Sequence, residues 1–209
     1  MKEVRIGLLV LLVFSVLLGI VYPLAVTGIS QLAFPHRANG SLIGLGDRVV
    51  GSELIGQSFS SPGYFHGRPS SSDYDPMNSG GSNLASAGST LLDEVEKRIA
   101  SVRSEYGLPR EASVPADFVL SSASGLDPEI SVASAVLQVE RISAARGIGA
   151  QTIQDLIQQL SRGPFLGAFG EERVNVLRLN LALDRLAGPR AQSGSGSAAS
   201  SSGVRGGEP

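Results

Sequence analysis

The side chains best suited to chemistry lie close together in one short stretch, residues 64–68. Tyr64 and Phe65 supply aromatic rings, His66 an imidazole and Arg68 a guanidinium. Arginine and aromatic side chains are typical anchors of protein interfaces, so one interpretation is that these four side chains contact a partner. The other is that the two rings plug the loop into its own domain while Arg68 is paired internally. The sequence leaves both interpretations open.

Catalysis by metal or by a nucleophile has few candidate residues in this chain. Its two histidines are His36 and His66, and it has no cysteine, so no zinc cluster and no disulfide are expected. Asp73 and Asp75 alternate like calcium ligands but lack the later glycine and glutamate of a calcium loop. A Ser-His-Asp site assembled in space around His66 stays open, because triads are recognised by geometry.

Phosphate chemistry by this chain alone is excluded. A phosphate-binding P-loop needs a lysine within Gly-x4-Gly-Lys-Ser/Thr, and the lysines here are Lys2 and Lys97. The Asp-Lys-Thr-Gly-Thr stretch that carries a phosphorylated aspartate is absent. Residues 79–84 (SGGSNL) could form a backbone nest for an anion, although glycines in a turn are the commoner reason for such a stretch. A net charge of −2 and the presence of only two lysines argue against the concentrated basic surface that nucleic-acid binding requires, so no nucleic-acid partner is expected.

The N-terminal part of the chain predicts a transmembrane helix over residues 6–34. No charged side chain occurs from Ile6 to Pro35, and 15 of the 21 residues from Ile6 to Val26 are Leu, Ile, Val or Phe. About 20 such residues span the hydrocarbon core of a bilayer. The alternative, a cleaved signal peptide, has a shorter apolar run and an A-x-A-like site, which this run does not show. Pro23 is expected to kink the helix.

The predicted orientation places the large domain outside the cytoplasm. Residues 1–5 form a short basic N-terminus with Lys2 and Arg5, and short basic tails usually remain on the cytoplasmic side. The expected location is therefore a bacterial inner membrane, crossed once, with the rest of the chain extracytoplasmic.

The remainder divides into a domain over residues 35–187 and a tail over residues 188–209. The tail is mostly Ser, Gly and Ala, a composition typical of disorder. The domain is long enough for one core. It is predicted to open with a hairpin whose strands flank residues 44–47, followed by a long ordered loop over residues 60–90. A further strand is predicted at Val114–Leu120.

Four helices are predicted in the second half of the domain, which makes its fold class α+β. The first begins near Thr90 with a capping-box-like Asp93. The second follows Asp127-Pro128, read as a helix cap and first turn. The third begins near Thr152 and ends before Gly163, and the last covers roughly Val174–Ala187.

Seven stretches of the chain, in order and spacing, resemble the C subunit of the Kdp-type potassium-transporting ATPase. The resemblance runs from the apolar helix to Leu186. The stretches are VYPLAVTGISQLAFP (21–35), ANGSLI (38–43), GSELIGQSF (51–59), YFHGRPS (64–70), SGGSNL (79–84), SGLDPEIS (124–131) and VNVLRLNLALDRL (174–186).

The resemblance implies a non-catalytic accessory subunit of a high-affinity, ATP-driven potassium uptake complex in the membrane. Its implied partners are a channel-like subunit that binds the potassium, a P-type ATPase subunit that hydrolyses ATP, and a small single-helix subunit. The implied role is to assemble or stabilise the complex and to raise the ATP affinity of the catalytic subunit. An extracytoplasmic domain could not touch ATP, so direct contact conflicts with the predicted orientation. The alternative function is a membrane-anchored extracytoplasmic hydrolase or binding module.

The chain departs from the family pattern at two places. Tyr74-Asp75-Pro76 replaces the usual Tyr-Asn-Pro, and residues 138–141 read Gln-Val-Glu-Arg instead of Gln-Val-Pro-Arg. Gln138 is the candidate for cofactor binding that the resemblance suggests. Without the proline, the helix around Gln138 is expected to continue without a kink.

Overall fold

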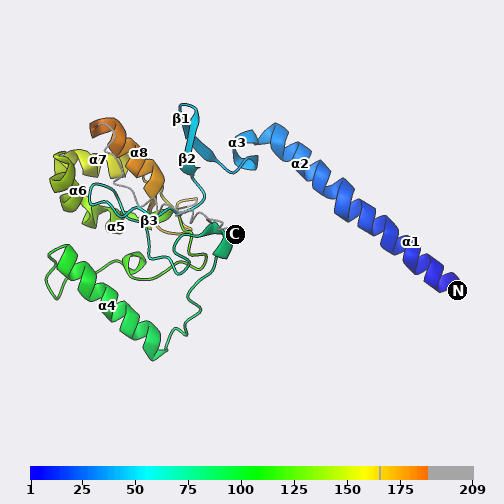
Figure 1. The fold of residues 1–209 in the computed structure, drawn as a ribbon, viewed down its shortest axis with the longest axis horizontal. Helices are drawn as coiled ribbons and strands as arrows, with labels where there is room; N and C mark the ends of the chain where they lie inside the picture. The colour runs from blue at the N-terminus through cyan, green and yellow to red at the C-terminus, as the bar shows by residue number, and fades with distance from the viewer. Residues whose placement is uncertain (165, 188–209) are drawn as a thin grey trace, which may run out of the picture.

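The long apolar helix is the most extended feature of the molecule. The computed structural model describes residues 1–164 and 166–187. In it, α1 (Lys2–Val16), η1 (Leu17–Val21) and α2 (Tyr22–Ala33) form one continuous rod that projects from the remainder of the chain (Figure 1). The most apolar 18-residue stretch within Lys2–Ala33 has a mean hydropathy of 2.8, and none of that stretch is buried. By length and composition this helix can cross a membrane, and the prediction of one apolar N-terminal helix is confirmed.

The expected kink at Pro23 is replaced by a wider turn just before it. Over Leu17–Val21 the backbone is π-helical, and the N–H of Tyr22 donates to the carbonyl of Leu17. Pro23 then lies in the first turn of α2, where its missing N–H costs little. The rod therefore stays nearly straight in Figure 1.

A β-hairpin follows the helix, as predicted. After the short α3 (Pro35–Ala38), β1 (Leu42–Leu45) pairs antiparallel with β2 (Arg48–Ser52). The turn between them uses Gly46 at φ +63°, a conformation that glycine adopts without steric cost. Figure 1 places this hairpin between the end of the long helix and the helices of the core.

The core is built from two strands that each lead directly into a helix. Strand β3 pairs antiparallel with β4, and α7 packs against α5, α6 and α8. The elements are β3 (Glu129–Ser131), α5 (Val132–Leu137), α6 (Val139–Arg146), α7 (Ala150–Leu160), β4 (Arg173–Asn175) and α8 (Val176–Ala187). The fully buried apolar side chains include Phe65, Ile142, Ile153, Ile157, Val174, Leu179 and Leu183. The α+β fold class is confirmed.

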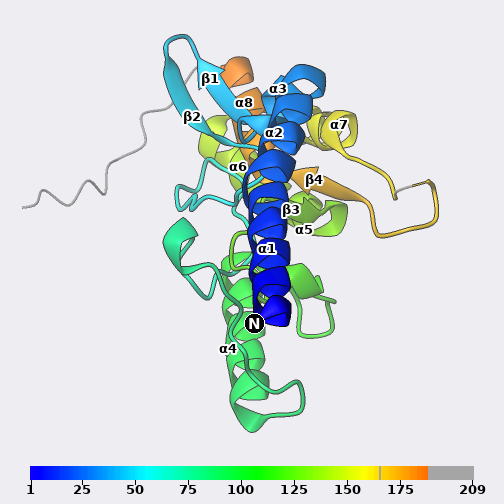
Figure 2. The ribbon, with the colours of Figure 1, turned by 90° about the vertical axis from the view of Figure 1, so that its right-hand side faces the viewer.

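A second group of elements lies apart from this core. Helix α4 (Ser89–Glu105) hangs away from α5–α8 in Figure 1 and Figure 2. Its Arg98 donates to the carbonyl of Val119 (2.8 Å) in the segment that returns from it, which contains η3 (Ala116–Phe118), and only its C-terminal end reaches α6, where Glu105 lies 3.9 Å from Arg141. The short η2 (Pro76–Asn78) lies in the long loop before α4. The edge-on contact of the Tyr106 and Phe118 rings, 5.4 Å between centroids, joins α4 to this return.

Several predicted boundaries are wrong for local reasons. The strand expected at Val114–Leu120 is not formed: Pro115 has no N–H for a ladder, and η3 occupies Ala116–Phe118. Asp127 caps no helix: it accepts from the N–H of Glu129 in β3, and Ser131 caps α5.

The other helix starts shift by one or two residues. Helix α4 begins at Ser89 without a side-chain cap, so the capping box at Thr90 is not formed. Helix α7 begins at Ala150 and α8 at Val176, two residues from the expected starts. The tail predicted over residues 188–209 lies outside the described residues.

Candidate functional site

The central segment, residues 62–66, passes through the middle of the core. Phe65 is fully buried and Tyr64 is 4% exposed. Phe65 belongs to the same hydrophobic cluster as Val139 and Leu179. One interpretation of the loop is that its two aromatic rings plug it into its own domain, and this interpretation requires the packing observed here. Contact of any of these residues with a partner stays a prediction.

Two buried amide side chains hold the backbone of this segment as a neighbouring strand would. Asn180 of α8 accepts from the N–H of Phe65 (2.7 Å) and donates to its carbonyl (3.0 Å). Gln138 accepts from the N–H of His66 (2.8 Å) and donates to its carbonyl (3.1 Å). A primary amide carries both a donor and an acceptor, so one side chain can satisfy both groups of one residue.

Two arginines of α6 bind the preceding carbonyls. Arg141 donates to the carbonyl of Pro62 (2.6 Å) and to that of Tyr64 (3.0 Å). The Nε of Arg146 donates to the carbonyl of Gly63. Every carbonyl from residue 62 to residue 66 therefore accepts from a side chain. Buried backbone groups need such partners, so α6 and α8 fix the path of the segment.

The ring of Tyr64 takes part in a buried charge network. The guanidinium of Arg146, whose side chain has no exposed surface, stacks over this ring at 4.4 Å and pairs with Asp184 at 2.8 Å. The Tyr64 hydroxyl donates to the same carboxylate at 3.1 Å. Burial, followed by the Asp184 carboxylate, raises the pKa of Tyr64. The charges of Arg146 and Asp184 are thus paired with each other inside the domain.

Gln138 lies at a break between two helices, contrary to expectation. Helix α5 ends at Leu137 and α6 begins at Val139, while Gln138 has φ −87° and ψ −8°. Its bonds to His66 hold it there, so no proline is needed for the interruption. Gln138 is fully buried, and both of its amide atoms are engaged. A nucleotide could reach it only after these bonds break; its role in cofactor binding stays a prediction that this geometry does not support.

His66 does not form a catalytic arrangement in the described part of the chain. Its Nε2 lies 3.1 Å from the carbonyl of Ser61, and among the described residues its ring has no hydrogen bond to a hydroxyl or carboxylate. Burial, followed by the charge of Arg141, lowers the pKa of His66. The hydrolase alternative built on His66 therefore finds no support in the geometry.

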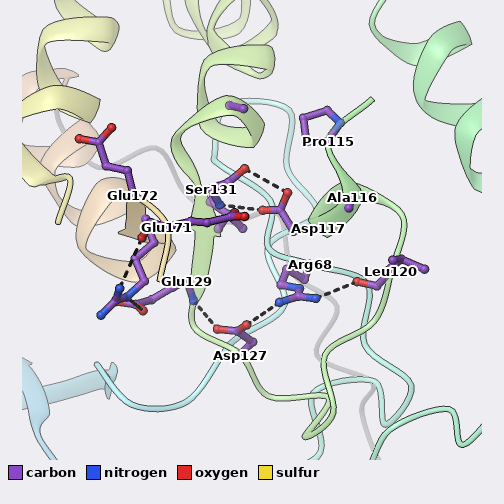
Figure 3. A pocket seen from close by; sticks show the side chains of 13 residues that line it. Arg68, Pro115, Ala116, Asp117, Leu120, Asp127, Glu129, Ser131, Glu171 and Glu172 are labelled. Atoms are coloured by element: carbon purple, nitrogen blue, oxygen red, sulfur yellow. Dashed lines mark hydrogen bonds and ion pairs between the residues drawn. The ribbon is translucent and has the colours of Figure 1, made fainter. Parts of the chain in front are cut away.

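Arg68 lies at the edge of a groove that we call the acidic groove (Figure 3). Its cavity has a volume of about 560 Å³. Arg68 donates to Asp127 (2.9 Å) and to the carbonyl of Leu120 (3.4 Å), so it is paired internally. The charged lining residues are Arg68, Asp117, Asp127, Glu129, Glu171, Glu172 and Arg173.

The carboxylates of the groove protect one edge of the small sheet. Asp117 accepts from the N–H of Ser131 (2.7 Å), and Asp127 accepts from the N–H of Glu129 (3.0 Å). These residues alternate along β3, so both N–H groups face the same edge. Covering them prevents another strand from pairing there. Among the described residues, no cluster of three or more metal-ligating side chains occurs.

Sequence reasoning missed the residues that hold the central segment. Asn180 and Asp184 lie four residues apart on one face of α8, beside the buried apolar side chains of Leu179 and Leu183. A buried polar residue in such a helix was the available signal, because it must find a partner. Nothing in the sequence indicated that the partner of Asn180 was the backbone of residue 65, or that Asp184 would meet Tyr64 and Arg146.

The helix and the core together match a known family. Residues 4–185 match the family described as "KdpC: K+-transporting ATPase, c chain". Similar curated proteins carry the name "Potassium-transporting ATPase KdpC subunit". One from Caldanaerobacter subterraneus subsp. tengcongensis is 46% identical over 87% of this chain and 94% of its own length. One from Gemmatimonas aurantiaca is 50% identical over 89% and 94%.

A third relative with this name, from Mycobacterium tuberculosis, is 50% identical over 86% of this chain and 96% of its own length. These matches cover both the apolar helix and the core. The chain belongs to the KdpC family, and it is a subunit of a K⁺-transporting ATPase.

Proposed function

We propose that the chain is a non-catalytic subunit that assembles and stabilises a potassium-pumping complex. Its long helix enters the inner membrane, and its domain lies on the extracytoplasmic side. Its partners are a channel-like chain that binds potassium, a P-type chain that hydrolyses ATP and a small single-helix chain. Potassium is the transported ion and is bound by the partner, not by this chain.

The observation that carries this proposal is that the candidate residues all serve the structure of the domain. The four candidate side chains and Gln138 are engaged in packing or hydrogen bonds that shape the domain. Such a site offers a rigid surface instead of a nucleophile with its base. The apolar helix, none of which is buried against the domain, leaves its whole circumference for lipid or for neighbouring helices.

An effect on ATP affinity would be exerted through the partner subunits. With the domain outside, ATP and this chain lie on opposite sides of the membrane, so the coupling has to pass through the transmembrane part of the complex. The positive N-terminal end, with Lys2 and Arg5, supports this orientation.

The test is to purify the chain in detergent alone and together with the proteins encoded beside its gene. Alone, it should hydrolyse no ATP. Together, it should co-purify with a P-type chain and a channel-like chain, and the complex should show potassium-stimulated ATPase activity. Omission of this chain should lower that activity.

Two results would contradict the proposal. One is ATP hydrolysis by the isolated chain. The other is full potassium-stimulated activity and normal complex assembly when this chain is omitted. Orientation is tested separately with Ser197→Cys, the sole thiol in a chain without cysteine. Labelling of intact spheroplasts by an impermeant reagent supports the outside position, and labelling only after lysis rejects it.

A further inference from the structure

A continuous series of hydrogen bonds connects the membrane helix to the core helix α8. It starts in the last turns of α2, where the amides of Gln31 and Asn39 exchange two hydrogen bonds of 3.2 Å. Asn39 also donates to the carbonyl of Pro35 (2.8 Å). The turn after α3 is therefore tied back to the end of the long helix.

The series continues across the base of the hairpin. The Ser52 hydroxyl donates to the carbonyl of Gly40 (2.7 Å), and the N–H of Glu53 donates to the carbonyl of Ser41 (3.1 Å). Ser41 is only 4% exposed and has φ +49°, a left-handed conformation that is uncommon outside glycine. These contacts hold it in that conformation and fix the direction in which the chain leaves the helix.

Glu53 completes the connection by contacting the last residue of β4 and the first turn of α8. Its carbonyl accepts from the side chain of Asn175 (2.9 Å), and its carboxylate accepts from Arg178 (2.6 Å). Asn175 in turn accepts from the N–H of Arg178 (3.0 Å), at the start of α8. Glu53 thus joins the hairpin base to two neighbours: its N–H binds the turn after α3, and its carbonyl and carboxylate bind the start of α8 and the residue before it.

We propose that Glu53 is a positioning residue that fixes the angle between the membrane helix and the domain. Covalent connection through the turn at residues 39–41 alone would allow a range of angles. The series from Gln31 to Arg178, which we call the junction, restricts this range. A fixed angle lets the helix and the domain engage partner chains together, because the second contact then forms at a high effective concentration.

The first measurement uses the isolated full-length chain, so it does not depend on the proposed function. The absence of cysteine permits clean spin labelling at Leu32→Cys, which is 88% exposed on α2, and at the exposed Gln159→Cys on α7. In lipid nanodiscs, pulsed electron resonance should give a single narrow distance peak. Glu53→Ala removes the carboxylate that pairs with Arg178 and keeps the backbone contacts of residue 53, so it should broaden this peak measurably.

The ion pair of Glu129 with Arg173 provides a matched control. It has the same 2.6 Å separation and similar exposure (24% and 41%, against 20% and 39% for Glu53 and Arg178), but it lies outside the junction. Glu129→Ala should keep the narrow peak. The charge exchange Glu53→Arg with Arg178→Glu should restore it in part. Equal broadening by both alanine variants, or none by Glu53→Ala, would overturn the proposal.

A second variant guards against loss of the fold. Gln31→Ala combined with Asn39→Ala removes the exposed end of the junction and touches no buried group, so the thermal unfolding of the domain should not change. The same broadening is expected. A narrow peak in this variant would show that the angle is set elsewhere and would overturn the role of the junction.

The final step rests on the proposed function and is measured in the assembled complex. Glu53→Ala should weaken retention of the chain in the complex by about tenfold, through loss of effective concentration, while Glu129→Ala should not. Broad distances with unchanged retention would overturn the positioning role. Failure of the unaltered chain to form any complex would instead reject the proposed function, and the distances in the isolated chain would still decide the rigidity of the junction.

Discussion

The central segment and the β-hairpin are both extended stretches, yet they obtain their stability in different ways. In the central segment, side chains from α6 and α8 satisfy the backbone, and Phe65 has no exposed surface. In the hairpin, the two strands satisfy each other, while Leu45 and Val49 remain 57% and 58% exposed. The one is a structural element of the core. The other presents exposed apolar side chains near the end of the long apolar helix.

This difference shows where the domain's stability is concentrated. Extended backbone must pair with something, and a lone hairpin in water is marginal by itself. The hairpin is fixed mainly at its base, by Ser52 and Glu53. Changes in the central segment should therefore affect folding, whereas changes at the hairpin tip should leave folding intact.

The largest expected effect is that of Phe65→Ala. It should lower the free energy of unfolding by about 3–5 kcal/mol, because the removed ring leaves a cavity in a packed core. Leu45→Ala, on the exposed hairpin, should change it by less than about 0.5 kcal/mol. Denaturant unfolding of the full chain in detergent measures both. Equal losses for the two variants would abolish the distinction between these regions.

The next largest effect is expected from Asn180→Leu. This nearly isosteric change leaves the N–H and carbonyl of Phe65 buried without partners, at a cost of about 2–4 kcal/mol. Gln151→Ala, which removes an exposed amide on α7, is the control and should be close to neutral. A neutral Asn180→Leu would mean that the segment is not held by this amide.

A smaller effect is expected in the acidic groove, which lies beside the central segment. Asp117→Ala removes the acceptor of the Ser131 N–H and of the Ser134 hydroxyl (2.6 Å), and should cost about 1–2 kcal/mol. Glu171→Ala changes an exposed carboxylate of the same groove and should have little effect. Thermal unfolding of the two variants separates a structural carboxylate from a solvent-facing one.

The smallest effect is a pH dependence that His66 confers on the central segment. Burial lowers the pKa of its imidazole in the folded chain below the usual 6.5. At a pH between this lowered pKa and 6.5, the unfolded chain therefore binds a proton that the folded chain does not. Stability should therefore be full above about pH 6.5 and should fall as the pH decreases towards the folded-state pKa. His66→Gln should remove this part of the slope. An unchanged slope in that variant would show that other groups cause it.

Much of the architecture was predictable because it depends on patterns along the chain. The apolar helix, the hairpin around Gly46, the helical second half and the family all followed from composition, turn residues and ordered motifs. The strand at Val114–Leu120 was wrong, although Pro115 was a visible warning. Strands β3 and β4 were missed, since three-residue strands show too little alternation to be detected.

The candidate site was predictable only as a list of residues. Arg68 is paired internally and Tyr64 and Phe65 are buried, but the sequence alone left this arrangement and partner contact equally open. Asp127 illustrates the limit. Its position before Pro128 fitted a helix cap, whereas its carboxylate serves a strand N–H and Arg68. A local motif cannot distinguish such uses when the competing partners are remote in sequence.

The sequence by itself determined the long apolar helix, the fold class and the family, because each depends on the order and periodicity of side chains along the chain. Only the tertiary structure decided that Asn180 holds residue 65 and Gln138 holds residue 66. It also decided that Glu53 joins the long helix to α8. These contacts link groups 72, 115 and 125 residues apart. Hydrogen bonds of this kind form only when packing of the apolar core brings distant segments within about 3 Å, and no local pattern records which segments will meet.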